Sequence, residues 1–268
     1  MTRRVTGPVL VLVALAPASA TAQRGPEARL SLTITGGTTI TQPTLWSIPR
    51  QPLLVPGTEG DPQPRYDTVS LARGFVTNLI FGVSGTYFPK PSFGLEIGAT
   101  WLGLTTETSC TGIAFDSLLG ATNRGMCIAM QGSSRSLGAI DFTAGVTGRL
   151  APRSMIGPYL HAGLGLTFYS VSTTYVEGPT FTGIKVVVDD PSPQRTAVGY
   201  VLGAGTTITL GPGYQFRADI ADVAERFERL TGPADRLARA ARGFQLSHHL
   251  TFAMGFGIVL AAKRGRRY

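Results

Sequence analysis

Large apolar side chains alternate with small ones along residues 249–260, the last long stretch of the chain. One set of alternate positions holds only large apolar side chains, namely Leu250, Phe252, Met254, Phe256, Ile258 and Leu260. The other set holds glycine, alanine, threonine, valine and His249. Because successive side chains of a strand point to opposite faces, this period of two predicts a β-strand with one apolar face. A tilted strand of about 9–11 residues spans a bilayer, so the stretch is long enough to cross a membrane.

The same alternation recurs in seven stretches upstream. They lie at residues 28–41, 72–88, 93–105, 135–150, 158–176, 195–210 and 214–223. In the second stretch, Phe75, Leu79 and Phe81 occupy the face that we expect to meet lipid. Together with the final stretch, the pattern predicts eight strands, each with one apolar face.

The connections between these strands alternate in length. The long ones lie at residues 42–71, 106–134, 177–194 and 224–243. Outer-membrane barrels have long loops at one end and short turns at the other. We therefore predict an all-β, eight-stranded antiparallel up-and-down transmembrane β-barrel with long extracellular loops and short periplasmic turns. Within the long connections, the Glu, Arg, Leu and Ala after residue 224 predict a short helix, and the run 184–188 predicts a strand beyond the membrane.

A water-soluble barrel also alternates, but its apolar face points inward and its other face carries many charges. Here the second face is mostly glycine, threonine, serine and alanine, and the lysines after residue 22 are confined to connections and the tail. Aromatic residues also gather near the predicted strand ends, as the interfacial girdles of a membrane barrel require. These are Tyr87, Phe93, Trp101, Tyr200, Tyr214 and Phe216. The pattern favours the membrane barrel over the soluble one.

Residues 1–22 have the three parts of a secretory signal peptide. Arg3 and Arg4 are positive, residues 9–16 form a short apolar core, and Ala20 and Ala22 mark a small-residue cleavage site. We therefore divide the chain into a signal peptide, residues 1–22, and a barrel domain, residues 23–268, and predict export to the bacterial outer membrane.

Composition and charge narrow the classes further. Charged residues make up only 15% of the chain, and after the signal no apolar run approaches the ~18 residues of a spanning helix. The formal net charge is +8, but no basic stripe is interleaved with aromatic side chains. The balance therefore favours anionic lipid head groups or a solvated face over nucleic-acid binding.

The alternating strands, the Gly-Pro-Tyr-Leu-His-Ala-Gly-Leu-Gly-Leu segment at 157–166 and the closing strand resemble small outer-membrane β-barrels of the OmpA transmembrane domain, OmpX and OmpW kind. The resemblance implies insertion by periplasmic chaperones and the barrel assembly machinery, which reads an aromatic residue at the end of the last strand. Here Tyr268 is aromatic, but the basic segment 263–267 separates it from the strand. The resemblance specifies the fold far more closely than the role.

Five charged residues have inward parity on their predicted strands: Glu96, Asp141, Arg149, Arg217 and Asp219. A buried charge without a partner is costly, so complementary pairs should form. The resemblance to small barrels implies that these residues form an ion-pair network inside the barrel. The network is either a structural plug or the lining of a gated polar pore.

Cys110 and Cys127 lie in the same long connection. Because exported proteins fold in an oxidising compartment, we predict that they form a disulfide. Free thiols or pairing with another chain are the alternatives. No histidine lies close by in the sequence to complete a metal site with the two thiols.

Ser247 and His249 are two residues apart on the last strand and therefore share a face, with inward parity. A hydroxyl beside a base is the minimum for acyl transfer, and some outer-membrane barrels modify lipid A in this way. A lipid substrate would require an outward site, however, and the sequence offers no clear acidic third member. We expect this pair, like His161, to line the lumen.

The sequence therefore predicts an outer-membrane protein with a structural or surface-interaction role through its long loops, without catalysis and without a cofactor or metal. Its predicted partners are outer-membrane lipid and lipopolysaccharide, the assembly machinery and an extracellular ligand of unknown identity. Two alternatives stay open. One is a narrow channel for small solutes, and the other is a lipid A acyl-modifying enzyme that uses Ser247 and His249.

Overall fold

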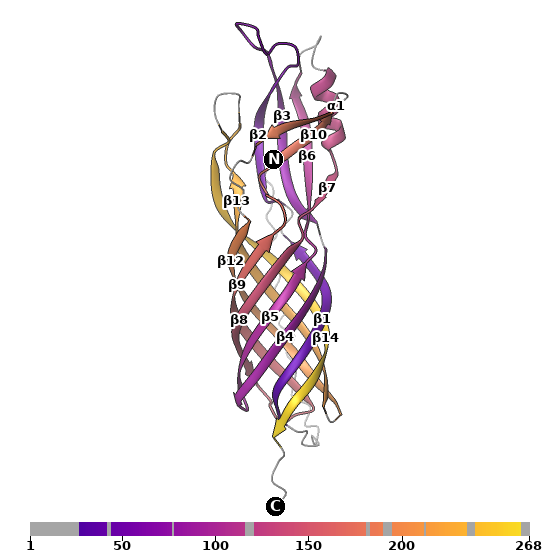
Figure 1. Cartoon of the computed structure of the whole chain (residues 1–268), viewed down its shortest axis with the longest axis vertical. Helices are drawn as coiled ribbons and strands as arrows, with labels where there is room; N and C mark the ends of the chain where they lie inside the picture. Colours follow the sequence, from indigo (N-terminus) through magenta and orange to yellow (C-terminus); the bar gives the residue numbers. More distant parts are fainter. Residues whose placement is uncertain are drawn as a thin grey trace, which may run out of the picture.

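The computed structural model describes residues 27–41, 44–76, 78–115, 121–180, 183–189, 195–211, 213–234 and 239–263. The predicted signal peptide, residues 1–22, and the end of the basic tail, residues 264–268, lie outside this part. The main body is a closed barrel with the strand order β1-β14-β13-β12-β9-β8-β5-β4 (Figure 1). The barrel closes because β1 pairs with both β14 and β4, and all neighbouring strands are antiparallel.

The eight barrel strands are long and join at one end through short turns, as predicted. Their bounds are β1 Glu27–Thr41, β4 Asn78–Lys90, β5 Phe93–Leu102, β8 Ala139–Arg149, β9 Ile156–Tyr169, β12 Thr196–Gly211, β13 Tyr214–Leu230 and β14 Arg242–Lys263. At the turn end, Gly213 has a φ of 90°, a left-handed conformation that glycine adopts without strain. The strands cross the barrel at a steep tilt (Figure 1).

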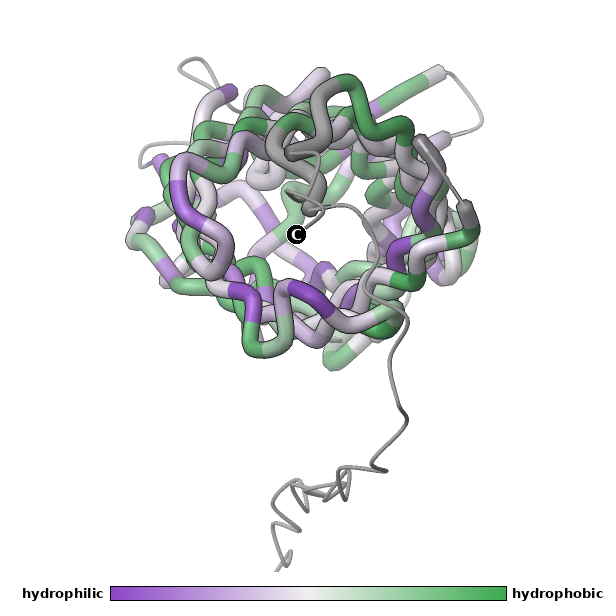
Figure 2. Tube along the Cα trace, turned by 90° about the horizontal axis from the view of Figure 1, so that it is seen from below, coloured by the Kyte–Doolittle hydropathy of each residue, from purple (hydrophilic) through white to green (hydrophobic). Residues whose placement is uncertain are grey.

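The outer surface of the barrel is apolar around its whole circumference. Outward side chains such as Ile34, Ile97, Leu164 and Val198 are 66–70% exposed. Viewed along the barrel from the turn end, the strands form one continuous ring around the lumen (Figure 2). Burying these side chains in lipid removes them from water, at about 25 cal/mol per Å² of apolar surface. The chain therefore has the all-β transmembrane barrel fold that the alternation predicts.

Aromatic side chains lie near both edges of this apolar surface. Toward one end, the Phe81 and Trp101 rings stack at 6.1 Å between centroids, and Phe142 meets Phe168 edge-on at 6.0 Å. At the turn end, Tyr214 is 50% exposed. Rings of this kind suit the interface between lipid and water, where an aromatic body contacts acyl chains near polar head groups.

The opposite end of the barrel carries a folded cap. A four-stranded sheet has the order β2-β3-β6-β7, with β2 Trp46–Leu54, β3 Tyr66–Val76, β6 Thr105–Ala114 and β7 Ser133–Ser136. Helix α1, Ala121–Met130, and the hairpin of β10, Val176–Thr180, with β11, Gly183–Val188, complete it. Among the described residues, no helix is long and apolar enough to cross a bilayer.

One hydrophobic core joins the cap to the mouth of the barrel. Its members from the cap include Ile48, Leu71 and Met130, which are at most 1% exposed. Its members from the barrel strands include Ile80, Leu102, Ala139, Tyr169, Ala197 and Phe227. Because this core is continuous, the cap and the barrel end are packed together.

Several predicted boundaries were wrong. The predicted strand 72–88 is two strands, because β3 belongs to the cap sheet and β4 to the barrel. Phe75, expected to meet lipid, is only 5% exposed and packs in the core beneath the cap. Thr77, on the same predicted face, lies outside the described residues. The predicted strands 135–150 and 158–176 likewise divide between cap and barrel.

The connection at 224–243 also differs from its prediction. Instead of a helix after residue 224, β13 continues to Leu230 and β14 begins at Arg242, with the two strands paired throughout. Residues 235–238 lie outside the described part. The run 184–188 is a strand, as expected, but it pairs with β10 in a separate hairpin rather than extending a barrel strand.

Candidate functional site in the barrel lumen

The lower part of the lumen, toward the turn end, is filled by an ion-pair layer built around Arg217. Its Nη1 lies 2.9 Å from Glu96 Oε1, and its Nη2 lies 3.5 Å from Asp219 Oδ2. The three side chains are 9%, 16% and 11% exposed. One guanidinium therefore pairs with two carboxylates that point into the lumen from β5 and β13.

Further hydrogen bonds satisfy the two carboxylates of this lower layer. Glu96 Oε2 accepts from the hydroxyl groups of Thr147, at 2.7 Å, and Thr86, at 3.4 Å. Asp219 accepts from the Tyr159 hydroxyl at 2.5 Å, and its other oxygen lies 3.2 Å from His161 Nε2. The layer therefore crosses the lumen from β4 through β5, β8, β9 and β13.

Two glycines of β12 make room for this layer. A Cβ placed on Gly203 would lie 2.1 Å from His161 Nε2, and one on Gly205 would lie 2.3 Å from the Tyr159 hydroxyl. Neither distance is compatible with a side chain. These two glycines on the inward face of β12 therefore leave the space that the His161 and Tyr159 rings of β9 occupy.

The five charged residues predicted to form one network are divided in the structure. Glu96, Arg217 and Asp219 meet in the lower layer. Arg149 lies nearer the turn end, with its guanidinium carbon 3.4 Å from the centroid of the Phe88 ring. Asp141 lies at a different height, where it contacts Thr167. Inward parity alone does not reveal this separation, because it contains no information on depth.

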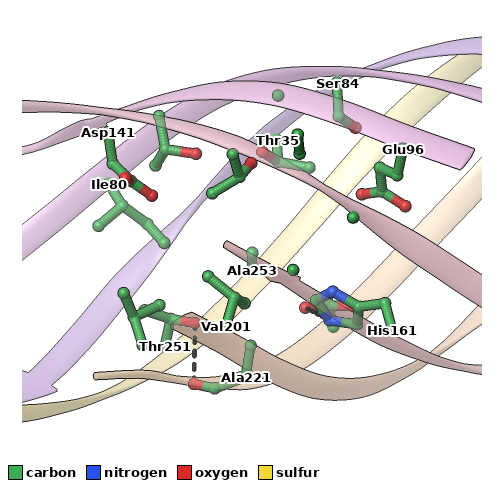
Figure 3. Close-up of a pocket in the computed structure, with 18 of the residues that line it drawn as sticks. Thr35, Ile80, Ser84, Glu96, Asp141, His161, Val201, Ala221, Thr251 and Ala253 are labelled. Carbon is green, nitrogen blue, oxygen red and sulfur yellow. Dashed lines mark hydrogen bonds and ion pairs between the residues drawn. The ribbon is translucent and has the colours of Figure 1, made fainter. Parts of the chain in front are cut away.

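Above the lower layer is a cavity of about 120 Å³. Its wall includes hydroxyl groups of Thr35, Ser84, Thr100 and Thr143, together with apolar side chains such as Val201. Figure 3 shows Glu96 and His161 toward one end of the cavity and Asp141 and Ile80 toward the other. The cavity is large enough for a few water molecules and has polar groups to bind them.

A second cluster of polar side chains, formed by Asp141, Thr167 and Glu225, lies at the cap end of the cavity. Thr167 Oγ1 lies 3.0 Å from Asp141 Oδ1 and 2.5 Å from Glu225 Oε1. The Tyr169 hydroxyl donates to Glu225 Oε2 at 2.6 Å. The prediction ended the strand at residue 223 and so missed Glu225. The alternation of inward Gln215, Arg217 and Asp219 continues to Glu225, and following it further would have found this residue.

An aromatic layer lies between this polar cluster and the cap. The Phe227 ring lies 5.1 Å from the Tyr169 ring and 5.1 Å from the Phe75 ring, and His249 lies 5.4 Å from Phe75. Phe75 comes from the cap strand β3, whereas Phe227 and His249 come from the barrel. The cap therefore contributes directly to the aromatic layer at the cap end of the lumen.

Ser247 and His249 point inward, as their parity predicts, and are only 1% and 2% exposed. Within the described part of the chain, neither ring nitrogen of His249 has a hydrogen-bond partner. The pair therefore lies inside the barrel, with His249 in the aromatic layer, rather than on the lipid-facing surface. The neighbouring His248 is the one that points outward, and its Nδ1 lies 2.8 Å from Asp222 Oδ2.

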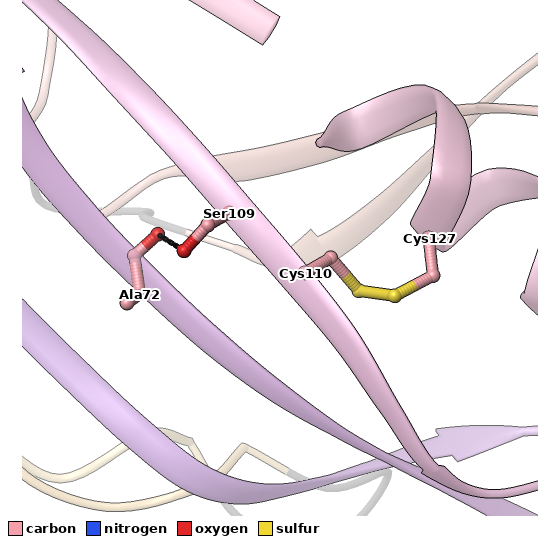
Figure 4. Close-up of a disulfide and its surroundings, with 4 residues drawn as sticks. All are labelled: Ala72, Ser109, Cys110 and Cys127. Atoms are coloured by element: carbon pink, nitrogen blue, oxygen red, sulfur yellow. Dashed lines mark hydrogen bonds between the residues drawn. A yellow bond between two sulfur atoms is a disulfide. The ribbon is translucent and has the colours of Figure 1, made fainter. Parts of the chain in front are cut away.

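The cap is fixed by a disulfide and by buried polar contacts. Cys110 of β6 and Cys127 of α1 form the predicted disulfide, with their Cα atoms 5.2 Å apart (Figure 4). Arg73 of β3 donates from Nη1 to the carbonyl oxygens of Thr173, at 3.1 Å, and Tyr175, at 2.7 Å. Burial, together with the nearby Arg135, lowers the pKa of Arg73 to about 10.

Lys185 joins three parts of the cap. Its Nζ donates to the carbonyl oxygen of Leu54 at 2.9 Å and to Oδ1 of Asn123 at 3.1 Å. Asn123 in turn donates to Asp67 at 2.8 Å. Burial lowers the pKa of Lys185. These bonds hold β11, β2 and α1 in one arrangement, so the cap is a folded unit rather than a set of separate loops.

The described residues contain no group of three or more His, Cys, Asp or Glu side chains arranged to hold a metal ion. No protein-family model matches the chain, and no curated protein sequence matches it.

Among solved structures, the chain is similar to the outer-membrane protein OprG from Pseudomonas aeruginosa, with a TM-score of 0.45 and 12% identity over 87% of this chain and 97% of that one. It is similar to Neisserial surface protein A, with a TM-score of 0.40 and 8% identity over 87% and 98%. It is also similar to the protease OmpT from Escherichia coli, with a TM-score of 0.41 and 10% identity over 91% and 99%.

Proposed function

We propose that this protein is an outer-membrane barrel that presents its cap at the cell surface as an interaction surface and does not conduct solutes. One observation carries the proposal. The hydrophobic core of the cap continues into the barrel mouth, where Phe75 of the cap packs on Phe227 of the barrel. A barrel that is sealed by a folded, disulfide-linked unit is suited to displaying that unit.

The outer-membrane location is supported by the barrel surface. A closed barrel satisfies its backbone hydrogen bonds between strands, which is a condition for crossing a bilayer. The exposed apolar side chains around the barrel match a lipid environment. With the long connections outside, as in other outer-membrane barrels, the cap faces the medium.

The cap offers apolar side chains that a partner can bury. Ile128 of α1 and Ile184 of β11 are 67% and 70% exposed, although neither belongs to the barrel surface. Val186, two residues along β11 from Ile184, is 48% exposed. Exposed apolar side chains away from lipid are candidates for a contact surface, which supports this part of the cap as the place where a ligand would bind.

A narrow channel is the second candidate function, and the hydroxyl-lined cavity favours it. The ion-pair layer on one side and the aromatic layer on the other oppose it, because both cross the lumen. No catalytic role is proposed, since Ser247 and His249 are buried inside the barrel, away from its lipid-facing surface.

Two measurements test the proposal. The first is single-channel conductance of the refolded protein in a planar bilayer, with heat-modifiable gel migration to show that the barrel has folded. We expect a folded barrel without steady conductance at neutral pH. Steady conductance from the unmodified protein would refute the sealed barrel and favour the channel.

The second measurement locates the cap. An epitope tag is inserted after Gly57, in the exposed β2–β3 turn, and, as a matched control, after Pro152 in the turn between β8 and β9. Antibody should label intact cells that carry the first tag and not those that carry the second. The reverse pattern would place the cap in the periplasm and exclude a cell-surface role.

The binding role is tested on bilayer-embedded protein with a panel of extracellular polysaccharides and matrix proteins. Binding that is lost in Ile128→Asp or Ile184→Asp, and kept in the barrel-turn variant Arg153→Gln, would support the cap surface. Binding that none of these substitutions changes would place the contact elsewhere.

A further inference from the structure

Two buried carboxyl groups share one hydroxyl group between the cavity and the aromatic layer. Thr167 Oγ1 lies within hydrogen-bond distance of both Asp141 Oδ1, at 3.0 Å, and Glu225 Oε1, at 2.5 Å. Asp141 is 4% exposed and Glu225 is 1% exposed. A threonine hydroxyl carries one proton and can therefore donate to only one of the two. The second contact is a hydrogen bond only if its carboxyl group supplies the proton.

The surroundings provide little positive charge to separate the two carboxyl groups. In the part of the chain that the structure describes, neither Asp141 nor Glu225 forms an ion pair with a lysine or an arginine. His249 Nε2 lies 3.8 Å from Glu225 Oε2, too far for a hydrogen bond. The other charged groups at the cavity, Glu96, His161, Arg217 and Asp219, contact one another in the lower layer.

We propose that Asp141 and Glu225 bind one proton between them at neutral pH, so that the pair carries a single negative charge. Two ionised carboxylates that shared one hydroxyl would repel each other in a site with little water, and like charges at such separations favour keeping one proton. The repulsion couples the two carboxyl groups, so the loss of the proton is a property of the pair, as in other coupled carboxyl dyads. Nothing in the proposed surface role requires it.

The hydrogen bonds indicate which carboxyl group holds the proton. Glu225 accepts from Tyr169 on one oxygen and has Thr167 at the other, so two donors stabilise its negative charge. Among the residues that the structure describes, Asp141 has a hydrogen-bond contact only with Thr167. The consistent arrangement is that Thr167 donates to ionised Glu225 and accepts the proton of neutral Asp141.

The proton lies at a place where charge would affect the seal. Tyr169, which binds Glu225, packs on Phe227, and Phe227 packs on Phe75 from the cap. Loss of the proton would put a second uncompensated charge directly below this aromatic layer. The protonated pair is therefore the form that is compatible with a closed lumen.

Infrared spectroscopy of the protein in lipid vesicles at neutral pH tests the proposal. A carboxylic acid has a carbonyl stretching band distinct from the carboxylate bands, and the band shifts in D2O. We expect one such band in the unmodified protein and its loss as the pH is raised. Absence of the band at neutral pH would overturn the proposal without any variant being needed.

Substitutions assign the band. Asp141→Asn should abolish it, while keeping the fold, because the amide can donate to Thr167 in place of the acid proton. Asp222→Asn is the matched control, since Asp222 is an exposed carboxylate on the outer surface, and the band should persist. A band that persists in Asp141→Asn, or disappears in Asp222→Asn, would show that another carboxyl group holds the proton. The result is independent of conductance and of ligand binding, so the surface role can fail while this site stands.

Discussion

Replacing Arg217 by glutamine tests whether the lower layer is held by charge. The substitution removes the guanidinium that lies 2.9 Å from Glu96 and 3.5 Å from Asp219, in a site where all three side chains are at most 16% exposed. Removing one partner of a buried ion pair costs about 3–5 kcal/mol, because the remaining charge is uncompensated. Thr147, Tyr159 and His161 still contact the carboxylates, so we expect the lower end, about 3 kcal/mol.

The measurement is equilibrium unfolding by urea in lipid vesicles, followed by tryptophan fluorescence. Trp101 is 44% exposed on the barrel exterior and reports on the barrel, whereas Trp46 is buried in the cap and reports on the cap. The Trp46→Phe background isolates the barrel signal. The loss of stability should appear in the Trp101 transition. Conductance should remain absent, because the aromatic layer is untouched.

A double-mutant cycle with Glu96→Gln tests whether the loss of stability in Arg217→Gln comes from the unpaired buried charge. Once Glu96 is neutral, Arg217→Gln leaves only one carboxylate, Asp219, without its guanidinium partner. The loss of unfolding free energy in the double variant should therefore be smaller than the sum of the two single losses by more than about 1 kcal/mol. Residues in contact typically couple by about 0.5–3 kcal/mol. Additive losses, or a loss below about 1 kcal/mol for Arg217→Gln alone, would refute the argument from buried charge.

Three further predictions concern Gly203, the disulfide and the cap lysine. Gly203→Ala places a Cβ 2.1 Å from His161 Nε2 and should destabilise the barrel by about 1–3 kcal/mol, whereas Gly60→Ala, in an open turn, should change little in the same urea assay. Replacing Cys110 and Cys127 by serine should cost the cap about 3 kcal/mol, seen as faster proteolysis of the cap with unchanged heat-modifiable migration, and equal protease resistance would contradict it. Lys185→Met should expose the β10–β11 hairpin to proteolysis. Burial lowers the pKa of Lys185 in the folded cap, so the unfolded cap binds more protons. The contribution of Lys185 to cap stability should therefore rise as the pH approaches the ordinary lysine pKa of 10.5. The Lys185→Met variant should lack this rise.

The closing strand shows how much the pattern of residues determined. The large side chains from Leu250 to Leu260 face outward and His249 faces inward, as the alternation predicted, because the period of two is a property of the extended backbone itself. The same reasoning placed Arg217 and Ser247 in the lumen. Parity needs only the local sequence, and lipid on one side makes it easy to recognise.

Phe75 shows where local pattern was insufficient. It shares a set of alternate positions with Leu79 and Phe81 in the sequence, but β3 ends at Val76 and belongs to the cap. An apolar side chain alternates in the same way whether it meets lipid or the core of another sheet. Only the packing of the cap against the barrel mouth decides between the two.

The sequence by itself predicted the closed barrel, the inward and outward faces of its strands except at Phe75, and the alternation of long and short connections, and it favoured the disulfide between the two cysteines. The tertiary structure decided the depth of each inward side chain. It joined Arg217 to Glu96, separated Asp141 from them, and brought Asp141 and Glu225 to opposite sides of Thr167. The physical reason is that contacts across a lumen depend on the stagger between strands, which is set when the whole barrel closes and which no single strand encodes.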